Sequence, residues 1–585
     1  MNYKLNKLEK GQQKTSVFSA LGKFWPLVTD EKKIAIGALI AVLFNSAFNL
    51  VSPLLVGYSI DHYIKSGDLH GLMVMAGILL VIYLLAFGTH YIQVHLMGGL
   101  GQRVLFKLRN QIFKKLQSFP VAFFNQNKAG DLISRINNDT DNLNQFFSQS
   151  LMQFIGTLFI MTGAAIFLVA INPLLGLASL VPAILIAIFT ALVSPWVKRK
   201  NAASLQSTGG MSAEIQESLS NFKVIVAFNR RNYFRDKFDE ANQNNFLAAV
   251  KADLANNIFN PVYGLSAHLA QLIVFSVGVY MISAGSLTVG FLISFLMYIG
   301  KFYDPVRQLA AVWSTFQVAM AAWERIYQIL SMKSDFETIE GHQRTSESLL
   351  EFKDVSFHYP DGREVLKQIN FTLERGKTYA LVGPTGGGKT TTASLMARLY
   401  DPTEGQVVLQ GKDIRSYDAI NRTKKIGFIL QEPFLFTGTV RDNILYGNED
   451  LETLTNEQLM LELEKANLGH LMKRFEQGLE TPVESAGESI SFGQRQLIAF
   501  MRAILRKPEL LILDEATANI DTFTEQLLED VLMKLHHTTT RVIIAHRLNT
   551  IQDADEIFFV NSGEVTRAGS LDHAMEMLLK GKKNS

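Results

Sequence analysis

TYALVGPTGGGKT, residues 378–390, joins an apolar strand-like run to a glycine-rich turn and the start of a helical pattern. The turn from Gly383 to Thr390 has the G-x-x-x-x-G-K-[ST] spacing. Its glycines allow backbone N–H groups to close around phosphate oxygens, while Lys389 supplies a point charge and Thr390 a hydroxyl for a magnesium ion. Because this spacing also arises by chance in plain strand–helix turns, its surroundings decide what it means.

Carboxylates follow a second apolar strand farther along the chain. Residues 510–513 read LLIL and end in Asp514 and Glu515, so that one carboxylate can hold a magnesium ion and the other can activate water. Another strand, residues 542–545, ends in His546, which can contact a γ-phosphate, although a lone histidine there is more often structural. The glycine-rich turn and the turn at Asp514 and Glu515 are expected at the carboxyl edge of one sheet. The pattern predicts an α/β P-loop nucleotide-binding domain over residues 351–585.

From Glu351 onward the chain resembles the nucleotide-binding domain of an ATP-binding cassette (ABC) transporter. Five motifs carry the resemblance: VSFHYP with Tyr359, LQEPFLF with Gln431, the signature ISFGQRQ from Ile490 to Gln496, ANID from Ala518 to Asp521, and His546. In this family two cassettes enclose two ATP molecules, and each signature faces the partner's nucleotide. The resemblance therefore implies ATP hydrolysis at a dimer interface.

The resemblance also implies a role for each matching residue. ATP and Mg²⁺ are the expected cofactors. Catalysis is assigned to Glu515 and His546, and magnesium binding to Thr390, Gln431 and Asp514. The residues expected to bind ATP are Tyr359, Gly383, Pro384, Thr385, Gly386, Gly387, Gly388, Lys389, Thr390, Thr391 and Gln431. Those expected to face the partner are Ser491, Phe492, Gly493 and Gln494 of the signature, with Asn519 and Asp521 in the dimer-interface loop.

The first half of the chain is strongly apolar. Stretches without Asp, Glu, Lys or Arg cover residues 34–60, 71–102, 142–197 and 254–300, the last two long enough for two membrane crossings each. Turns are expected at Asn172–Pro173 and at residues 283–286. An all-α transmembrane domain is thus predicted over residues 1–330, with a linker over 331–350. Its six spans are expected at about 34–60, 71–97, 149–171, 174–197, 260–282 and 287–308.

Basic residues in the loops set the expected orientation. The N-terminal segment and the loops 103–141 and 198–253 are rich in Lys and Arg, so both termini are expected in the cytoplasm of a multi-pass protein, with a bacterial plasma membrane as its location. By the resemblance, each loop ends in a short transverse helix that rests on a cassette, one near Phe123, Phe124, Asn125 and Gly130, the other near residues 227–234. The 585-residue chain has a net charge of +2 without a basic face, which argues against nucleic acid, and it has no cysteine for disulfides or thiolate metal sites.

The signature departs from the family's LSGGQ, because Ile490 replaces leucine and Phe492 replaces the first glycine. Glycine permits close backbone approach, whereas a phenyl ring adds bulk beside the partner's phosphates. One reading is that Phe492 points away from the nucleotide and matters little. The other is a heterodimer in which this chain keeps the full catalytic set and its partner supplies an intact signature. A homodimer stays open as an alternative.

Polar residues within the spans are candidates for a substrate path: Asn45, Asn49, His90, His268 and Gln271. His268 is the best of these candidates, although an interhelical hydrogen bond is the more common role for such a residue, and Lys301 and Asp304 are expected to be solvated. The predicted function is ATP-driven export of an amphipathic drug, lipid or peptide by alternating access, with membrane lipid and a second half-transporter as partners. An importer with the same fold and an ATP-gated regulatory membrane protein are the alternatives. The sequence does not specify the substrate.

Overall fold

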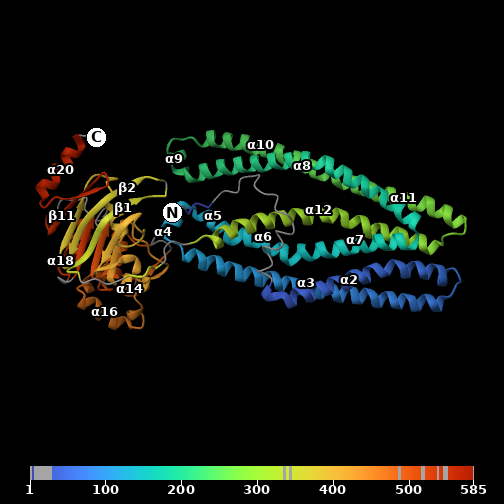
Figure 1. Ribbon diagram of the computed structural model, residues 1–585, viewed down its shortest axis with the longest axis horizontal. Coiled ribbons are helices and arrows are strands. Elements are labelled where there is room, and N and C mark those ends of the chain that lie inside the picture. The colour runs from blue at the N-terminus through green and yellow to red at the C-terminus, as the bar shows by residue number, and fades with distance from the viewer. Residues whose placement is uncertain are drawn as a thin grey trace. The chain divides into compact units, whose positions relative to one another are not determined.

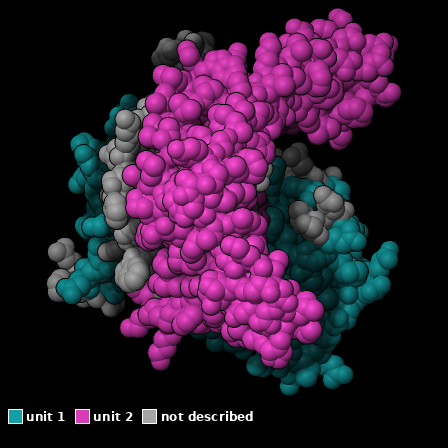
Figure 2. Space-filling model, turned by 90° about the vertical axis from the view of Figure 1, so that its right-hand side faces the viewer, with its two compact units in different colours: residues 1–6, 116–129, 332–585 teal, residues 7–115, 130–331 magenta. Residues whose placement is uncertain are grey.

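The computed structural model describes residues 3–5, 29–333, 338–341, 346–360, 362–484, 489–514, 521–535, 539–544 and 551–583. The chain divides into two compact units, which Figure 2 colours separately. The helical unit comprises residues 7–115 and 130–331, and the sheet unit comprises residues 1–6, 116–129 and 332–585. A short piece of the first half of the chain therefore belongs with the sheet unit.

Long helices build the helical unit (Figure 1). Among the described residues, six helical segments are long and apolar enough to cross a membrane, which confirms the predicted number of spans. The helices are α2 (Lys32–Ser59), α3 (Leu69–Gln117), α7 (Leu151–Ile171), α8 (Pro173–Ser220), α10 (Arg231–Asn257), α11 (Phe259–Ser283) and α12 (Val289–Ser331). Several of these helices run well past the apolar stretches into the basic loops 103–141 and 198–253.

The two tight turns form where the sequence predicts them. Asn172 caps α8 by accepting a hydrogen bond from the backbone N–H of Leu175 at 3.0 Å, and Pro173 takes the first helical position, where no N–H is needed. The turn between α11 and α12 contains Gly285 with a φ of 74°. Both connections are thus encoded locally.

Short helices interrupt the two long loops. The first is α4 (Val121–Gln126), which contains Phe123, Phe124 and Asn125, whereas Gly130 lies in the next helix, α5 (Ala129–Ser134). The second is α9 (Phe222–Ala227), which ends where the sequence predicted its transverse helix to begin. The apolar run FKVIVA favours the helix there, and a turn with Asn229 at a φ of 53° separates it from α10.

A seam of hydrogen bonds joins α2 to α12. The side chains of Ser294 and Tyr298 donate to the backbone carbonyls of Pro53 and Leu50, and Lys301 Nζ donates to Asn49 Oδ1 at 3.3 Å. Lys301 is half-buried, so the expectation that it is simply solvated was wrong. Its long side chain reaches a polar partner on the neighbouring helix, which offsets the loss of water.

At the far end of the same seam the two backbones come very close. A Cβ atom added to Gly57 would lie 2.4 Å from the carbonyl oxygen of Gly290, and one added to Gly290 would lie 2.0 Å from the carbonyl oxygen of Gly57. Asp61, in the π-turn that follows α2, accepts hydrogen bonds from the backbone N–H of Gly290, at 2.9 Å, and from the hydroxyl of Thr288. Only glycine fits at these two positions of the seam.

Two sheets form the frame of the sheet unit. A four-stranded sheet has the order β2-β1-β4-β5, and a six-stranded sheet has the order β12-β11-β3-β10-β9-β6. In the larger sheet all neighbours pair in parallel except β11 and β12. Its strands are β3 (Thr378–Val382), β6 (Ile426–Ile429), β9 (Leu510–Asp514), β10 (Thr540–Ile544), β11 (Glu556–Asn561) and β12 (Glu564–Arg567). The smaller sheet contains β1 (Ser348–His358), β2 (Glu364–Glu374), β4 (Glu404–Leu409) and β5 (Lys412–Asp413).

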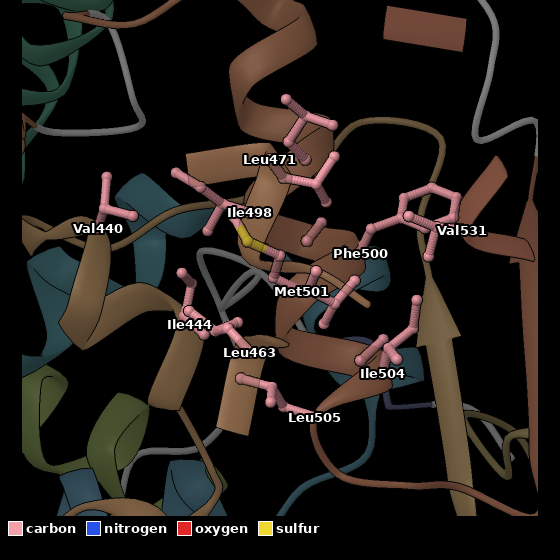
Figure 3. Packing of buried hydrophobic residues seen from close by; sticks show 14 of the residues in the cluster. Val440, Ile444, Leu463, Leu471, Ile498, Phe500, Met501, Ile504, Leu505 and Val531 are labelled. Carbon is pink, nitrogen blue, oxygen red and sulfur yellow. The ribbon is translucent and has the colours of Figure 1, made fainter. Parts of the chain in front are cut away.

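The remaining elements of the sheet unit are mostly helices, and the predicted α/β class is confirmed. They are α13 (Lys389–Met396), α14 (Ala419–Lys425), α15 (Val440–Leu445), α16 (Asn456–Lys465), α17 (Phe492–Ile504), α18 (Thr522–Met533) and α20 (Leu571–Lys583), with the short strands β7 (Gly438–Thr439) and β8 (Pro482–Val483). A core of buried apolar side chains from α15, α16, α17 and α18 includes Ile498, Phe500 and Met501 (Figure 3). This core holds α17 in place.

A polar cluster fixes the start of β1. The carboxylate of Glu351 pairs with Lys353 Nζ at 2.5 Å and accepts hydrogen bonds from the hydroxyls of Ser346 and Ser348. The Lys353 ammonium first, and then the two hydroxyls, lower the pKa of Glu351 to about 2. Glu351 is therefore ionised at neutral pH.

Candidate functional site

The glycine-rich turn after β3 has the backbone of a phosphate-binding loop. Gly383, Gly386 and Gly388 have φ values of 149°, 81° and 115°, which residues with a side chain rarely adopt. A Cβ atom added to Gly383 would lie 2.0 Å from the carbonyl oxygen of Val560, at the end of the neighbouring strand β11. The loop therefore rests on the sheet and turns into α13 at Lys389.

Lys389 is folded back onto its own loop. Its Nζ donates hydrogen bonds to the carbonyl oxygens of Gly383 at 2.9 Å and Pro384 at 3.0 Å, and the residue is only 6% exposed. A buried ammonium needs such partners because it has left water. These carbonyls hold the charge in place beside the loop, where a phosphate group would be a stronger partner.

Oxygen ligands meet at the end of the parallel strands. Asp514, the last residue of β9, is 5% exposed, and its Oδ1 lies 3.4 Å from Thr390 Oγ1 at the start of α13. Since β10 alone separates β3 from β9, the topology brings these two residues to one edge of the sheet. A hydroxyl and a carboxylate suit Mg²⁺, which takes few protein ligands and keeps phosphate and water oxygens. The donor set here fits a magnesium ion.

A cavity of about 530 Å³ opens beside the loop, and Tyr359 lines it together with Thr385, Gly386, Gly388, Lys389, Thr390 and Thr391. Tyr359 directly follows β1, and its hydroxyl lies 3.0 Å from Thr391 Oγ1. The cavity is therefore lined by both an aromatic ring and a phosphate loop, the two chemistries that an adenine nucleotide requires.

Several residues of this cavity are not predicted from the sequence: Arg363, Glu364, Val365, Lys367, Ser562 and Gly563. The guanidinium carbon of Arg363 lies 6.0 Å from the centroid of the Tyr359 ring. Arg363 could have been predicted from the sequence. It lies in the hairpin turn just after Tyr359, and such a turn brings a basic side chain back to the aromatic ring. Ser562 and Gly563 come from the distant turn between β11 and β12, which no local pattern connects to the loop.

The signature residues form the first turn of α17, which begins at Phe492. Ser491 caps the helix in a capping box: its hydroxyl accepts from the Gln494 backbone N–H at 3.2 Å, and Gln494 Oε1 accepts from the Ser491 N–H at 2.9 Å. Phe492 takes the first helical position with an ordinary negative φ. Its ring packs partly against the core around α17, and the Arg495 guanidinium lies 5.4 Å from its centroid.

Other residues tie α17 to the loop that contains Gln431. Gln496 Nε2 donates to the carbonyl oxygen of Gln431 at 3.1 Å. Arg502 donates to the carbonyl oxygens of Asn443 at 2.8 Å and Phe434 at 3.1 Å, and to Asn443 Oδ1 at 3.1 Å. The signature helix and this loop thus share a hydrogen-bonded frame.

Some predicted site residues are not brought to the cavity, or lie outside the described residues. The Gln431 side chain is exposed and is not among the described residues that line the cavity. Asp521 caps α18, and hydrogen bonds from Thr524 lower the pKa of its carboxyl. Glu515, Asn519 and His546 lie outside the described residues.

Comparisons with known proteins agree with this geometry. Residues 35–306 match the family model of the ABC transporter transmembrane region, and residues 366–518 match that of the ABC transporter. The uncharacterized ABC transporter ATP-binding protein YfiC of Bacillus subtilis is 33% identical over 558 residues, which cover 94% of this chain and 91% of the relative. The chain belongs to the ABC transporter family.

Two further ABC relatives have names that state a substrate. The fatty acid ABC transporter ATP-binding/permease protein of Mycobacterium bovis is 32% identical over 86% of this chain and 79% of its own length. The ATP-dependent lipid A-core flippase of Mannheimia succiniciproducens is 30% identical over 98% of both chains. This ABC transporter is an exporter-type, multi-pass membrane protein whose ATPase domain is coupled to transport. As a half-transporter it acts as a dimer.

The transmembrane region of this ABC transporter contains a cavity of about 410 Å³ between α2, α3 and the start of α7. Of the predicted path residues, Asn45 and His90 line it, whereas Asn49, His268 and Gln271 do not. His268 Nδ1 lies 3.2 Å from Gln271 Oε1, one turn along α11, so its hydrogen bond is within one helix and not between helices as predicted. The polar lining of the cavity comprises Asn45, Ser46, His90, Gln93, Ser148, Gln149, Gln153 and Thr157.

Proposed function

We propose that this ABC transporter exports an amphipathic compound whose polar part is uncharged. The observation that carries the proposal is the lining of the 410 Å³ cavity, where amides and hydroxyls alternate with apolar side chains such as Val42, Met97 and Ile160. Among the described residues that line it there is no Asp, Glu, Lys or Arg. A charged headgroup would find no counter-charge there, whereas a hydroxyl-rich or amide-rich one would find hydrogen bonds.

Three glutamine amides and one imidazole of this cavity are available for a ligand. Within the part of the chain that the structure describes, the side chains of His90, Gln93, Gln149 and Gln153 have no hydrogen-bond partner. His90, Gln149 and Gln153 are exposed and Gln93 is half-buried, so the polar atoms of these side chains are accessible to hydrogen-bond a compound in the cavity. Met97 and Met152 beside them offer a soft apolar surface for a chain or ring.

The experiment compares three detergent-like probes that share a dodecyl chain and differ only in the headgroup: maltoside, trimethylammonium and sulfate. We expect the maltoside to stimulate ATP hydrolysis by the reconstituted transporter most strongly, and Gln93→Leu and Gln153→Leu to reduce this stimulation. Gln271→Leu, outside the cavity, is the matched control. Stronger stimulation by either charged probe, or stimulation that survives both cavity substitutions, would overturn the proposal.

The sheet unit is proposed to bind ATP in its 530 Å³ cavity, with adenine against Tyr359 and the phosphates on the loop Gly383–Thr391. Lys389 would exchange two loop carbonyls for phosphate oxygens, which are stronger partners for its charge. Thr390 and Asp514, with Gln431, would hold a magnesium ion, which supplies charge neutralisation for the phosphates. Glu515 and His546 are assigned the activation of water and the γ-phosphate contact.

The proposed dimer is a heterodimer in which this chain supplies the hydrolysing site. The support is the contrast between a complete set of Lys389, Thr390 and Asp514 and a signature in which Phe492 places a ring at the start of α17. Ser491, Gly493, Gln494, Asn519 and Asp521 would face the partner's nucleotide. Closure of the two cassettes would then drive alternating access in a bacterial plasma membrane, with both termini in the cytoplasm.

ATP turnover of the purified chain without a second subunit tests this pairing. We expect slow hydrolysis that rises severalfold in Phe492→Gly, because the substitution restores the missing glycine of the signature. Glu515→Gln is made in the parent chain and in Phe492→Gly, and loss of turnover in both shows that the measured hydrolysis belongs to this chain. A stable homodimer that hydrolyses ATP as fast as its Phe492→Gly variant would show that no intact partner signature is needed.

A further inference from the structure

A short segment near the start of the chain, Tyr3–Leu5, lies along α4, more than a hundred residues away in sequence. The backbone N–H of Tyr3 donates to Gln126 Oε1 at 2.9 Å, and that of Leu5 donates to Asn127 Oδ1 at 3.0 Å. The amide of Asn127 also returns a hydrogen bond to the carbonyl oxygen of Tyr3 at 3.0 Å. Two side chains at the end of α4 thus hold an extended backbone in register.

The segment is also anchored by burial. Tyr3 is 4% exposed and Leu5 is 8% exposed. The Tyr3 ring packs edge-on against Phe119 and Phe123, with centroids 6.2 and 6.4 Å apart, and these two phenylalanines stack on each other at 4.4 Å. Phe123 is itself fully buried in α4. Hydrogen bonds and aromatic packing together fix Tyr3–Leu5 in place on α4.

From α4 the contacts continue to the nucleotide cavity, all within the sheet unit. Asn125 Nδ2 donates to the hydroxyl of Tyr400 at 2.6 Å. The Tyr400 ring stands edge-on to the Tyr359 ring, at 5.6 Å and 87°. Tyr359 in turn reaches Thr391 of the phosphate loop through its hydroxyl at 3.0 Å. Each step is a direct contact between neighbouring side chains.

We infer that Tyr3–Leu5 is a clip that positions α4, so that Asn125 holds Tyr400 and Tyr400 holds the Tyr359 ring where adenine binds. Tyr3 is thereby a positioning residue for ATP binding, although it lies outside the cavity. The inference rests on the proposed role of Tyr359 in stacking on adenine. It gives the transporter a contact through which Tyr3–Leu5 affects nucleotide affinity from outside the cavity.

The test measures nucleotide binding to the full-length chain with trinitrophenyl-ATP as the probe, displaced by ATP or by inorganic tripolyphosphate. We expect Tyr3→Ala and Asn125→Ala each to weaken ATP about three- to tenfold, the effect of one lost contact of this strength, and to leave tripolyphosphate unchanged. Tyr3→Phe keeps the ring and should bind ATP as the parent chain does. The variant with both Tyr3→Ala and Asn125→Ala should bind ATP no more weakly than the weaker-binding single variant, because both substitutions act through the same series of contacts.

Two outcomes separate a failure of this inference from a failure of the proposed site. If Tyr359→Ala leaves ATP binding unchanged, the proposed adenine contact is wrong, and Tyr3–Leu5 then positions a ring that does not bind the nucleotide. If Tyr359→Ala weakens ATP but Tyr3→Ala and Asn125→Ala do not, the clip is overturned. A general loss of structure would weaken ATP and tripolyphosphate alike, and this result also contradicts the inference. Should Tyr3→Ala fail to fold, Asn127→Ala cuts two bonds to the segment without removing a ring and must show the same selective loss.

Discussion

Arg502 offers a direct measure of how firmly the signature helix is held. Its guanidinium makes three hydrogen bonds, two to backbone carbonyls and one to Asn443 Oδ1, and it lies 5.4 Å from the centroid of the Tyr446 ring. We predict that Arg502→Ala lowers the stability of the sheet unit by about 3 kcal/mol, taking roughly 1 kcal/mol for each of the two more buried hydrogen bonds and for the ring contact. The two lost hydrogen bonds to Asn443 account for most of this loss.

For a domain of this size, about 3 kcal/mol corresponds to a fall of roughly 6–12 °C in the unfolding midpoint. The assay is scanning calorimetry of the full-length protein in detergent, following the transition that saturating ATP shifts upward. Lys534→Ala is the control, because its side chain is 56% exposed and its ion pair with Asp530 spans 3.9 Å. An unfolding midpoint of Arg502→Ala equal to that of the control would refute the view that Arg502 fastens α17 to α15 and to the loop at Phe434.

Three further predictions concern the sheet unit. Gly383→Ala should reduce ATP affinity in a displacement assay at least about tenfold, because its Cβ would lie 2.0 Å from the Val560 carbonyl oxygen, whereas Gly386→Ala, which meets no atom within 4 Å and is strained only by its φ of 81°, should lose less. Phe500→Ala should lower stability by about 3–5 kcal/mol, since the ring is fully buried in the core of Figure 3; a calorimetric midpoint equal to the parent's would contradict this packing. Glu351 has a pKa lowered to about 2, below the roughly 4.3 of an unfolded chain, so its stabilising effect is present above that value and is lost as the pH falls toward 2. Unfolding midpoints of the parent and Glu351→Gln should therefore differ most above pH 5 and converge as the pH falls to about 2, and a difference that grows on acidification would show the opposite sign.

Much of the fold could be predicted from the sequence because its signals are local. The apolar stretches gave six spans, and Asn172–Pro173 marked a helix start through its own capping chemistry. The phosphate loop and the Asp514 strand were likewise recognisable, because the glycine spacing and the apolar strand with a terminal carboxylate are each contained in a short stretch of sequence. The parallel order of β3, β10 and β9 then brings Thr390 and Asp514 together.

The features that the sequence did not predict depend on contacts between distant segments. Lys301 was expected in water because its flanks suggest a helix end, but its partner Asn49 lies on another helix. For His268 a partner on another helix was predicted, whereas its partner Gln271 lies on the same helix, because periodicity does not show which polar neighbour a side chain contacts. The packing of Tyr3 on α4 has no local signal either, because three residues carry no periodicity.

The facing glycines of the α2–α12 seam have a consequence for sequence variation. Each one makes room for the other's backbone carbonyl, so a substitution at Gly57 or at Gly290 meets main-chain atoms that no rotamer change can move away. A compensating change elsewhere would have to push two whole helices apart and break the Asp61 hydrogen bonds as well. Among close relatives, these two positions should therefore change together or stay glycine together, and an alignment that shows them drifting independently would mark a transporter with a wider gap between its first and sixth spans.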